Sequence, residues 1–147
     1  MTSCFRRVAF ILSLVGFSSV AVVSQKAVPD PVLVFVGHEA HEWNGKKLVQ
    51  YKYVVENRTD FPNELFAPAP ELPPCGRNTK ASRTWLDFID QDGKYIYGFC
   101  ALADHDELSK ISFNIVEGSA VPRQVYVILI DRQTDKRYYS NHVDTPQ

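Results

Sequence analysis

A histidine-rich segment, HEAHEW at residues 38–43, is where metal chemistry would first be sought in this chain. A zinc protease needs His-Glu-x-x-His on a helix, because two histidines four residues apart then share one face. Here Glu42 stands where the second histidine is required, and His41 follows His38 by only three residues. In an extended chain this spacing puts the two imidazoles on opposite faces. The segment therefore predicts a solvated strand end or loop, and no metal site is expected.

Cysteine chemistry is limited by how few thiols the chain has. There are three cysteines, and Cys4 lies in an N-terminal leader, which leaves Cys75 and Cys100. A nucleophilic Cys75 would need a histidine base, but its neighbours are Pro74 and Gly76, and the flanking segment holds no histidine. A redox pair would have Cys-x-x-Cys spacing, which is absent. In an exported chain a disulfide is expected between the two, tying a proline-rich loop to the strand that ends at Cys100.

The segment DQDG at residues 90–93 does not fit a calcium loop. If Gly93 is the sixth loop residue, Phe88 and Phe99 take the first and twelfth positions, where carboxylates are required. The segment predicts a hairpin turn instead, in which Gly93 adopts a positive φ.

The remaining catalytic patterns point to no local site. No serine stands in a Gly-x-Ser-x-Gly elbow, and the seven glycines form no phosphate-binding loop. The segment ADHDE predicts a turn capped by Asp104, with Glu107 three residues later, and a weak adventitious cation site is its alternative. Carboxylate pairs for glycoside hydrolysis come from distant strands and stay open. We expect no catalytic residue, metal or cofactor; the alternative is a small secreted hydrolase or metal-dependent enzyme whose site is assembled from distant strands.

The elements that must position these residues are strands. In KLVQYKYVVENRT, the side chains at positions 49, 51, 53 and 55 are apolar or aromatic and are expected on one buried face. The proline-rich stretch at 61–74 predicts a long crossover with one helical turn at Asn63 to Phe66. Apolar or alternating runs predict the other strands at residues 32–36, 82–90, 94–100, 111–116, 124–131 and 138–143.

About seven strands with no long helical period predict an all-β fold. The expected architecture is an antiparallel β-sandwich of the immunoglobulin or fibronectin type III kind, and a small barrel is the main rival. Trp85, Tyr97 and Phe99 are expected in the core, with Trp85 packed on the disulfide.

The first 24 residues have the features of a secretory signal peptide. Arg6 and Arg7 precede an uncharged apolar run at residues 8–23, and small residues at positions 22 and 24 allow cleavage before Gln25. A single membrane anchor is the alternative. Residues 25–147 then form one domain, secreted or periplasmic, with no stable membrane span after cleavage. Cleavage removes two basic and no acidic residues, so the net charge changes from −1 to −3. Nucleic acid and anionic membranes are not expected as partners.

Two cysteine-containing motifs carry a resemblance to known proteins. The chain has PPCGRNTKASRTW from residue 73 and YGFCAL from residue 97. It resembles small exported bacterial domains with the pattern PPCGxNTxASRTW and a Tyr-Gly-Phe-Cys strand, over roughly Val49 to Asp131. The resemblance implies a β-sandwich of unassigned activity, and it implies no catalytic residues.

Two groups of side chains are the candidate binding surface. Tyr138 and Tyr139 are consecutive on an expected edge strand, so that one ring projects from each face. Arg77, Asn78 and Arg83 lie around the proline-rich loop. Structural roles are the alternatives: an edge strand protected by charges, and side chains that bond the loop's own carbonyls. The expected function is an exported, non-catalytic module that binds a protein or a cell-envelope component.

Overall fold

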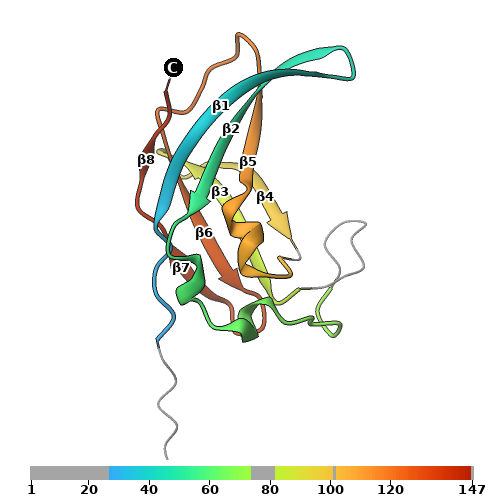
Figure 1. Ribbon diagram of the computed structural model, residues 1–147, viewed down its shortest axis with the longest axis vertical. Coiled ribbons are helices and arrows are strands. Elements are labelled where there is room, and N and C mark those ends of the chain that lie inside the picture. The colour runs from blue at the N-terminus through green and yellow to red at the C-terminus, as the bar shows by residue number, and fades with distance from the viewer. Residues whose placement is uncertain (1–26, 74–81, 101, 147) are drawn as a thin grey trace, which may run out of the picture.

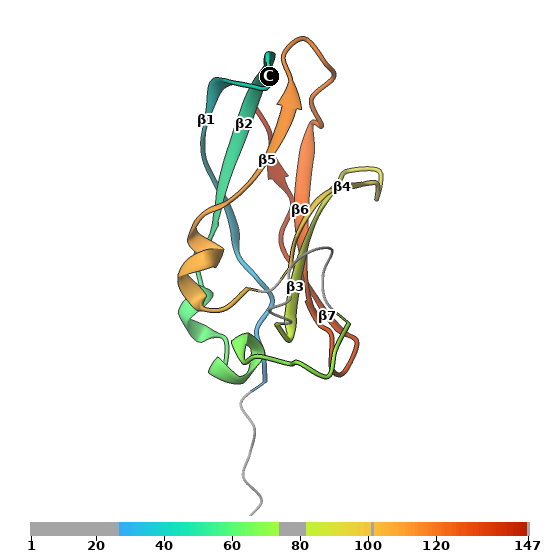
Figure 2. The same ribbon diagram turned by 90° about the vertical axis from the view of Figure 1, so that its right-hand side faces the viewer.

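The computed structural model describes residues 27–73, 82–100 and 102–146, and in this part the chain is all-β. Figure 2 shows two facing layers of strands. The described strands are β1 (Leu33–Trp43), β2 (Lys46–Val55), β3 (Thr84–Asp90), β4 (Tyr95–Cys100), β5 (Ile111–Val116), β6 (Gln124–Asp131), β7 (Lys136–Tyr139) and β8 (Val143–Asp144). Three short 3-10 turns, η1 (Arg58–Asp60), η2 (Asn63–Phe66) and η3 (His105–Ser109), connect them.

Both sheets are antiparallel, which confirms the predicted sandwich at this level. The smaller sheet has the order β1-β2-β5, and the larger has β4-β3-β6-β7, with β8 also paired to β6. The segment expected as one strand at 138–143 is divided between β7 and β8, which pair with β6 one after the other in the same direction and are separated by the irregular residues 140–142. No helix among the described residues is long and apolar enough to cross a membrane.

The histidine-rich segment is the largely exposed C-terminal half of β1, which agrees with the predicted solvated strand end, although the strand is longer than the predicted residues 32–36. β1 continues through it, because each residue from Gly37 to Trp43 pairs with a residue of β2. The register shifts between Phe35 and Gly37, which places a bulge before the histidines. The polar character of the segment therefore marks an exposed half of β1 that is held by backbone pairing.

The core lies between the layers, and the predicted alternation of β2 is confirmed by the burial of Tyr51, Tyr53 and Val55. Phe88 of β3 contacts Tyr53 and Phe113, with ring centroids 5.3 and 5.2 Å apart. The prediction that Tyr97 is a core residue is wrong, because its side chain is 49% exposed.

The predicted turns are present. Gly93 has φ +79° in the β3–β4 hairpin, and the Asp90 carboxylate accepts from the backbone N–H groups of Asp92 and Lys94. The side chain of Asp104 caps η3 by accepting from the Glu107 N–H at 3.1 Å. The expected helical turn is η2, which buries Leu65 and Phe66.

One side-chain amide joins the start of β1 to the C-terminal segment. Asn141 Oδ1 accepts from the Leu33 N–H at 2.8 Å, and Asn141 Nδ2 donates to the Leu33 carbonyl at 3.0 Å. The Asn141 amide therefore satisfies the backbone groups of Leu33 as a residue of a neighbouring strand would, and it links the two ends of the domain.

Asn141→Asp is expected to lower the free energy of unfolding by about 1–2 kcal/mol, because it removes the donor and sets a carboxylate oxygen against the Leu33 carbonyl. Urea unfolding of the mature protein measures this change. The control is Asn63→Asp on the exposed surface of η2, for which a change within about 0.5 kcal/mol is expected. Equal effects of the two variants would mean that the hydrogen bonds between Asn141 and Leu33 do not stabilise the fold.

Candidate functional site

Two of the five predicted binding residues meet in a pocket at one end of the sandwich. Arg83 precedes β3 and Tyr138 lies in β7, and both line a cavity of about 530 Å³. The cavity also contacts η2, which is at the lower end of the molecule in Figure 1, beside the start of the described chain. We call this cavity the end pocket; its other lining residues are Val28, Pro62, Glu64, Leu65, Asp131, Thr134 and Lys136.

An ion pair between Arg83 and Asp131 is part of the end-pocket wall. Arg83 Nε donates to Asp131 Oδ1 and Nη2 donates to Oδ2, each at 2.7 Å. The two side chains are 24% and 3% exposed. Asp131 also accepts from Thr134 Oγ1 at 2.6 Å and from the Gln133 N–H at 3.1 Å. Its carboxylate is thus fully engaged, so Arg83 is held in place rather than free to follow a ligand.

The ion pair sets the charge state of the pocket. Hydrogen bonds from Arg83, and to a smaller extent from Thr134 and the Gln133 N–H, lower the pKa of Asp131 from 3.8 to about 2, against the effect of burial. Asp131 in turn raises the pKa of Arg83. Both groups are therefore charged at neutral pH.

The remainder of the pocket combines apolar walls with exposed charges. Val28, Pro62 and Leu65 supply the apolar walls, and Glu64 and Lys136 bring opposite charges to the rim. Tyr138 pairs with Leu129, so its ring lies on the core-facing side of β7. Such a surface can accept an apolar side chain while rim charges fix its orientation.

Of the other predicted binding residues, Tyr139 is the one that the structure describes, and it is not part of this pocket. Tyr139 pairs with Ile128 on the outer face of the larger sheet, where it is 51% exposed. Arg77, Asn78 and Cys75 lie outside the described residues. Cys100 is the last residue of β4, directly opposite Trp85 of β3.

Trp85 is on the outer face of the larger sheet and not in the core. It is half-buried, and the guanidinium of Arg132 lies 5.6 Å from its ring centroid. The prediction that Trp85 is a core residue is therefore wrong. Because directly opposed residues of antiparallel strands project from the same face, Trp85 is a neighbour of Cys100.

Beside Trp85, a polar cluster occupies the space above Gly98. A Cβ on Gly98 would lie 2.7 Å from Asp87 Oδ1, 2.9 Å from the Tyr95 hydroxyl and 3.1 Å from Trp85 Nε1. Burial raises the pKa of Asp87, while the Trp85 N–H and the charge of Arg137 oppose this rise. The glycine of the Tyr-Gly-Phe-Cys motif thus leaves room for a partly buried carboxylate.

The four histidines lie in separate surroundings. His38 and His41 are three residues apart on the extended β1, while His105 Nε2 is 2.9 Å from the Phe61 carbonyl and His142 stacks on Tyr126. In the described part of the chain, no three His, Cys, Asp or Glu side chains gather closely enough to hold a metal ion.

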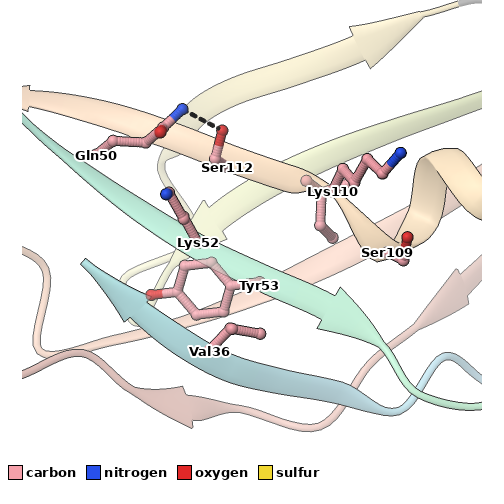
Figure 3. A pocket seen from close by; sticks show the side chains of 8 residues that line it. Val36, Gln50, Lys52, Tyr53, Ser109, Lys110 and Ser112 are labelled. Atoms are coloured by element: carbon pink, nitrogen blue, oxygen red, sulfur yellow. Dashed lines mark hydrogen bonds between the residues drawn. The ribbon is translucent and has the colours of Figure 1, made fainter. Parts of the chain in front are cut away.

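A second hollow lies against the smaller sheet. It has a volume of about 330 Å³, and Figure 3 shows Val36, Lys52 and Lys110 around a hydrogen bond from Gln50 Nε2 to Ser112 Oγ. Lys52 forms an ion pair with the exposed Glu39 at 2.6 Å. The charged groups around this second hollow are solvated, whereas the end pocket contains a buried carboxylate.

Asp131 and Lys136 are end-pocket residues that sequence reasoning missed. A signal was present, because Val125, Val127 and Leu129 alternate on the buried face of β6 and Asp131 continues this alternation. A carboxylate at an inward position requires a partner. The pattern did not identify that partner as Arg83, which is 48 residues away.

Comparison with protein-family models, with curated proteins and with solved structures finds no match.

Proposed function

We propose that this protein is an exported, non-catalytic β-sandwich module that binds another protein or a cell-envelope component through the end pocket. The observation that carries the proposal is the convergence of Arg83, Tyr138 and Lys136 with apolar walls in a cavity of about 530 Å³. This cavity adjoins η2 of the proline-rich crossover, and binding residues are commonly found on loops that a rigid scaffold positions.

The strand order supports a sandwich of the fibronectin type III or immunoglobulin kind. The first, second and fifth strands form one sheet, and the fourth, third, sixth and seventh follow one another in the other. The chain thus crosses from one sheet to the other after β2, after β4 and after β5, as in the Greek-key connections of these sandwiches.

The export proposal includes a signal peptide over residues 1–24, a secreted or periplasmic location and a Cys75–Cys100 disulfide. The last of these is expected because two cysteines in an exported chain form a disulfide in an oxidising compartment. Intact-mass analysis of the mature protein, with and without reductant, tests the pairing. We expect the mass without reductant to be lower than the reduced mass by two hydrogen atoms, and both masses to correspond to a chain that begins at Gln25. Two free thiols would contradict the pairing.

Affinity capture from envelope extract under oxidising conditions tests the binding function. The variant Lys136→Glu with Tyr138→Ala reverses an exposed charge and removes a ring at the end pocket, while the Arg83–Asp131 pair stays intact. We expect it to reduce capture of the wild-type partner about tenfold or more, because central aromatic residues often dominate interface energies.

The matched control is Lys46→Glu with Tyr139→Ala, which changes one exposed lysine and one exposed tyrosine away from the end pocket. Circular dichroism and urea unfolding establish that both variants remain folded. Equal capture by the two variants, or equal loss in both, would exclude the end pocket as the binding surface.

A further inference from the structure

The smaller sheet ends one strand before the larger sheet does. β5 is the last strand of the order β1-β2-β5, whereas the larger sheet continues past β3 to β4. Phe113 of β5 packs on Phe88 of β3, with ring centroids 5.2 Å apart. β5 therefore lies over β3, and β4, which forms the right-hand edge of its sheet in Figure 1, extends beyond it.

As a result, the core-facing side of β4 is incompletely covered. Tyr97 is directly opposite Phe88, so both side chains project toward the smaller sheet. Phe88 is 0% exposed, but Tyr97 is 49% exposed and packs edge-to-face on Phe99 at 5.2 Å. We attribute this difference to the position of β5, whose Phe113 ring packs on Phe88.

A groove runs along this open side of the sandwich. Its volume is about 420 Å³, and residues of both edge strands line it, together with the segment before β6. Ile96, Ile115 and Val121 in its walls are only partly buried, although they pack against the core. We call this hollow the seam groove. Its walls also include the charged side chains of Asp90 and Lys94 from the β3–β4 hairpin, so apolar side chains could fill the part beside Ile96, Ile115 and Val121.

The two strands that border the seam groove lack the usual protection of sheet edges. Neither Tyr95–Cys100 nor Ile111–Val116 contains a charged residue. The opposite edges are charged: β1 carries Glu39 and Glu42, and β7 begins with Lys136–Arg137. Charged side chains on an edge strand prevent pairing with another chain. Among the edge strands that the structure describes, β4 and β5 are therefore the ones open to strand addition.

We propose that an extended segment of a partner protein adds to the free edge of β5 and fills the seam groove as a fourth strand of the smaller sheet. Backbone hydrogen bonds to β5 supply affinity, and apolar side chains at alternate positions of the segment cover Tyr97 and Ile96. Constant-type immunoglobulin sandwiches hold a strand of their own at this place, in the sheet order A-B-E-D.

A single segment fits this place better than a second copy of the chain. In each copy the larger sheet projects one strand beyond the smaller. Two-fold pairing of β5 with its copy would therefore drive the two β4 strands into the neighbouring larger sheets. The occupant is accordingly a lone strand with an uncharged centre and apolar residues at every second position.

The test uses a blocked heptapeptide of alternating valine and threonine, titrated into the isotope-labelled mature protein by NMR. We expect saturable amide shifts concentrated in β5 and β4. The same peptide with a central proline should cause no such shifts, because proline cannot donate in the ladder. Tyr97→Asp should weaken binding about tenfold or more, because it sets a charge on the face of β4 that the added strand would cover. Tyr139→Asp, at an equally exposed tyrosine on the outer face, should leave binding unchanged.

The proposal is overturned if the shifts are absent, if the proline peptide causes them equally, or if Tyr97→Asp leaves them unchanged. Analytical ultracentrifugation of the same samples adds one more decisive outcome: a dimer that Tyr97→Asp dissolves would make a second copy the occupant. The seam groove and the end pocket are on different surfaces. Failure of the peptide titration therefore leaves the end-pocket capture experiment intact, and the reverse also holds.

Discussion

Phe88→Ala is expected to lower the free energy of unfolding by about 3–5 kcal/mol, the largest effect of any substitution considered. Phe88 is 0% exposed, and its ring contacts Tyr53, Phe99 and Phe113, which come from three strands and both sheets. Removing the ring leaves a cavity that two hydrogen-bonded sheets cannot close. Urea unfolding measures the loss as a lower midpoint at an unchanged slope.

The matched control for this prediction is Tyr97→Ala, which removes a ring from the same face of the larger sheet. Because Tyr97 is 49% exposed, we expect a loss of about 1 kcal/mol or less. Similar losses in the two variants would mean that β4 is covered as fully as β3, and this would also contradict the seam groove.

Arg83→Ala is expected to lower the free energy of unfolding by about 2–4 kcal/mol, because it leaves the Asp131 carboxylate buried without its bidentate partner. The bonds from Thr134 and Gln133 remain, which keeps the loss below that of a fully unpaired charge. Arg137→Ala is the control. Its ion pair with Asp135 is exposed and 3.7 Å long, so a change within about 0.5 kcal/mol is expected.

The Arg83 prediction has a pH dependence of definite sign. Asp131 has a pKa of about 2 in the folded protein, below its ordinary value of 3.8. A lowered pKa stabilises the folded state above the unfolded value and loses this effect as pH falls through the folded value. The stability difference between wild type and Arg83→Ala should therefore be constant from pH 7 to about 5 and shrink between about pH 4 and 2. A difference that does not change in that interval would contradict the pair.

Arg83 illustrates why a residue can be identified correctly while its role is not. The sequence placed it beside the proline-rich loop as a candidate for binding. In the structure, Arg132 donates to the carbonyls of Ser82 and Pro73, while Arg83 is bonded to Asp131. Arg132 thus bonds the loop and Arg83 forms the ion pair. Only the pairing of β3 with β6 decides which arginine has which role.

The strands and turns could be predicted because they depend on short-range regularities. Alternation with period two identified the buried face of β2, since one face of a half-buried strand must be apolar. Gly93 and Asp104 marked their turns because a positive φ and a capping carboxylate act within a few residues. These features need no knowledge of the remainder of the chain.

The order of strands in the sheets was decided only by tertiary structure, because periodicity does not encode which edges pair. That order brings Arg83 to Asp131 and Tyr138 at one end of the sandwich. It also leaves β4 one strand beyond β5, so that Tyr97 is exposed although its local pattern is that of a core residue. Burial depends on what lies across the layer, and both candidate surfaces follow from that long-range arrangement.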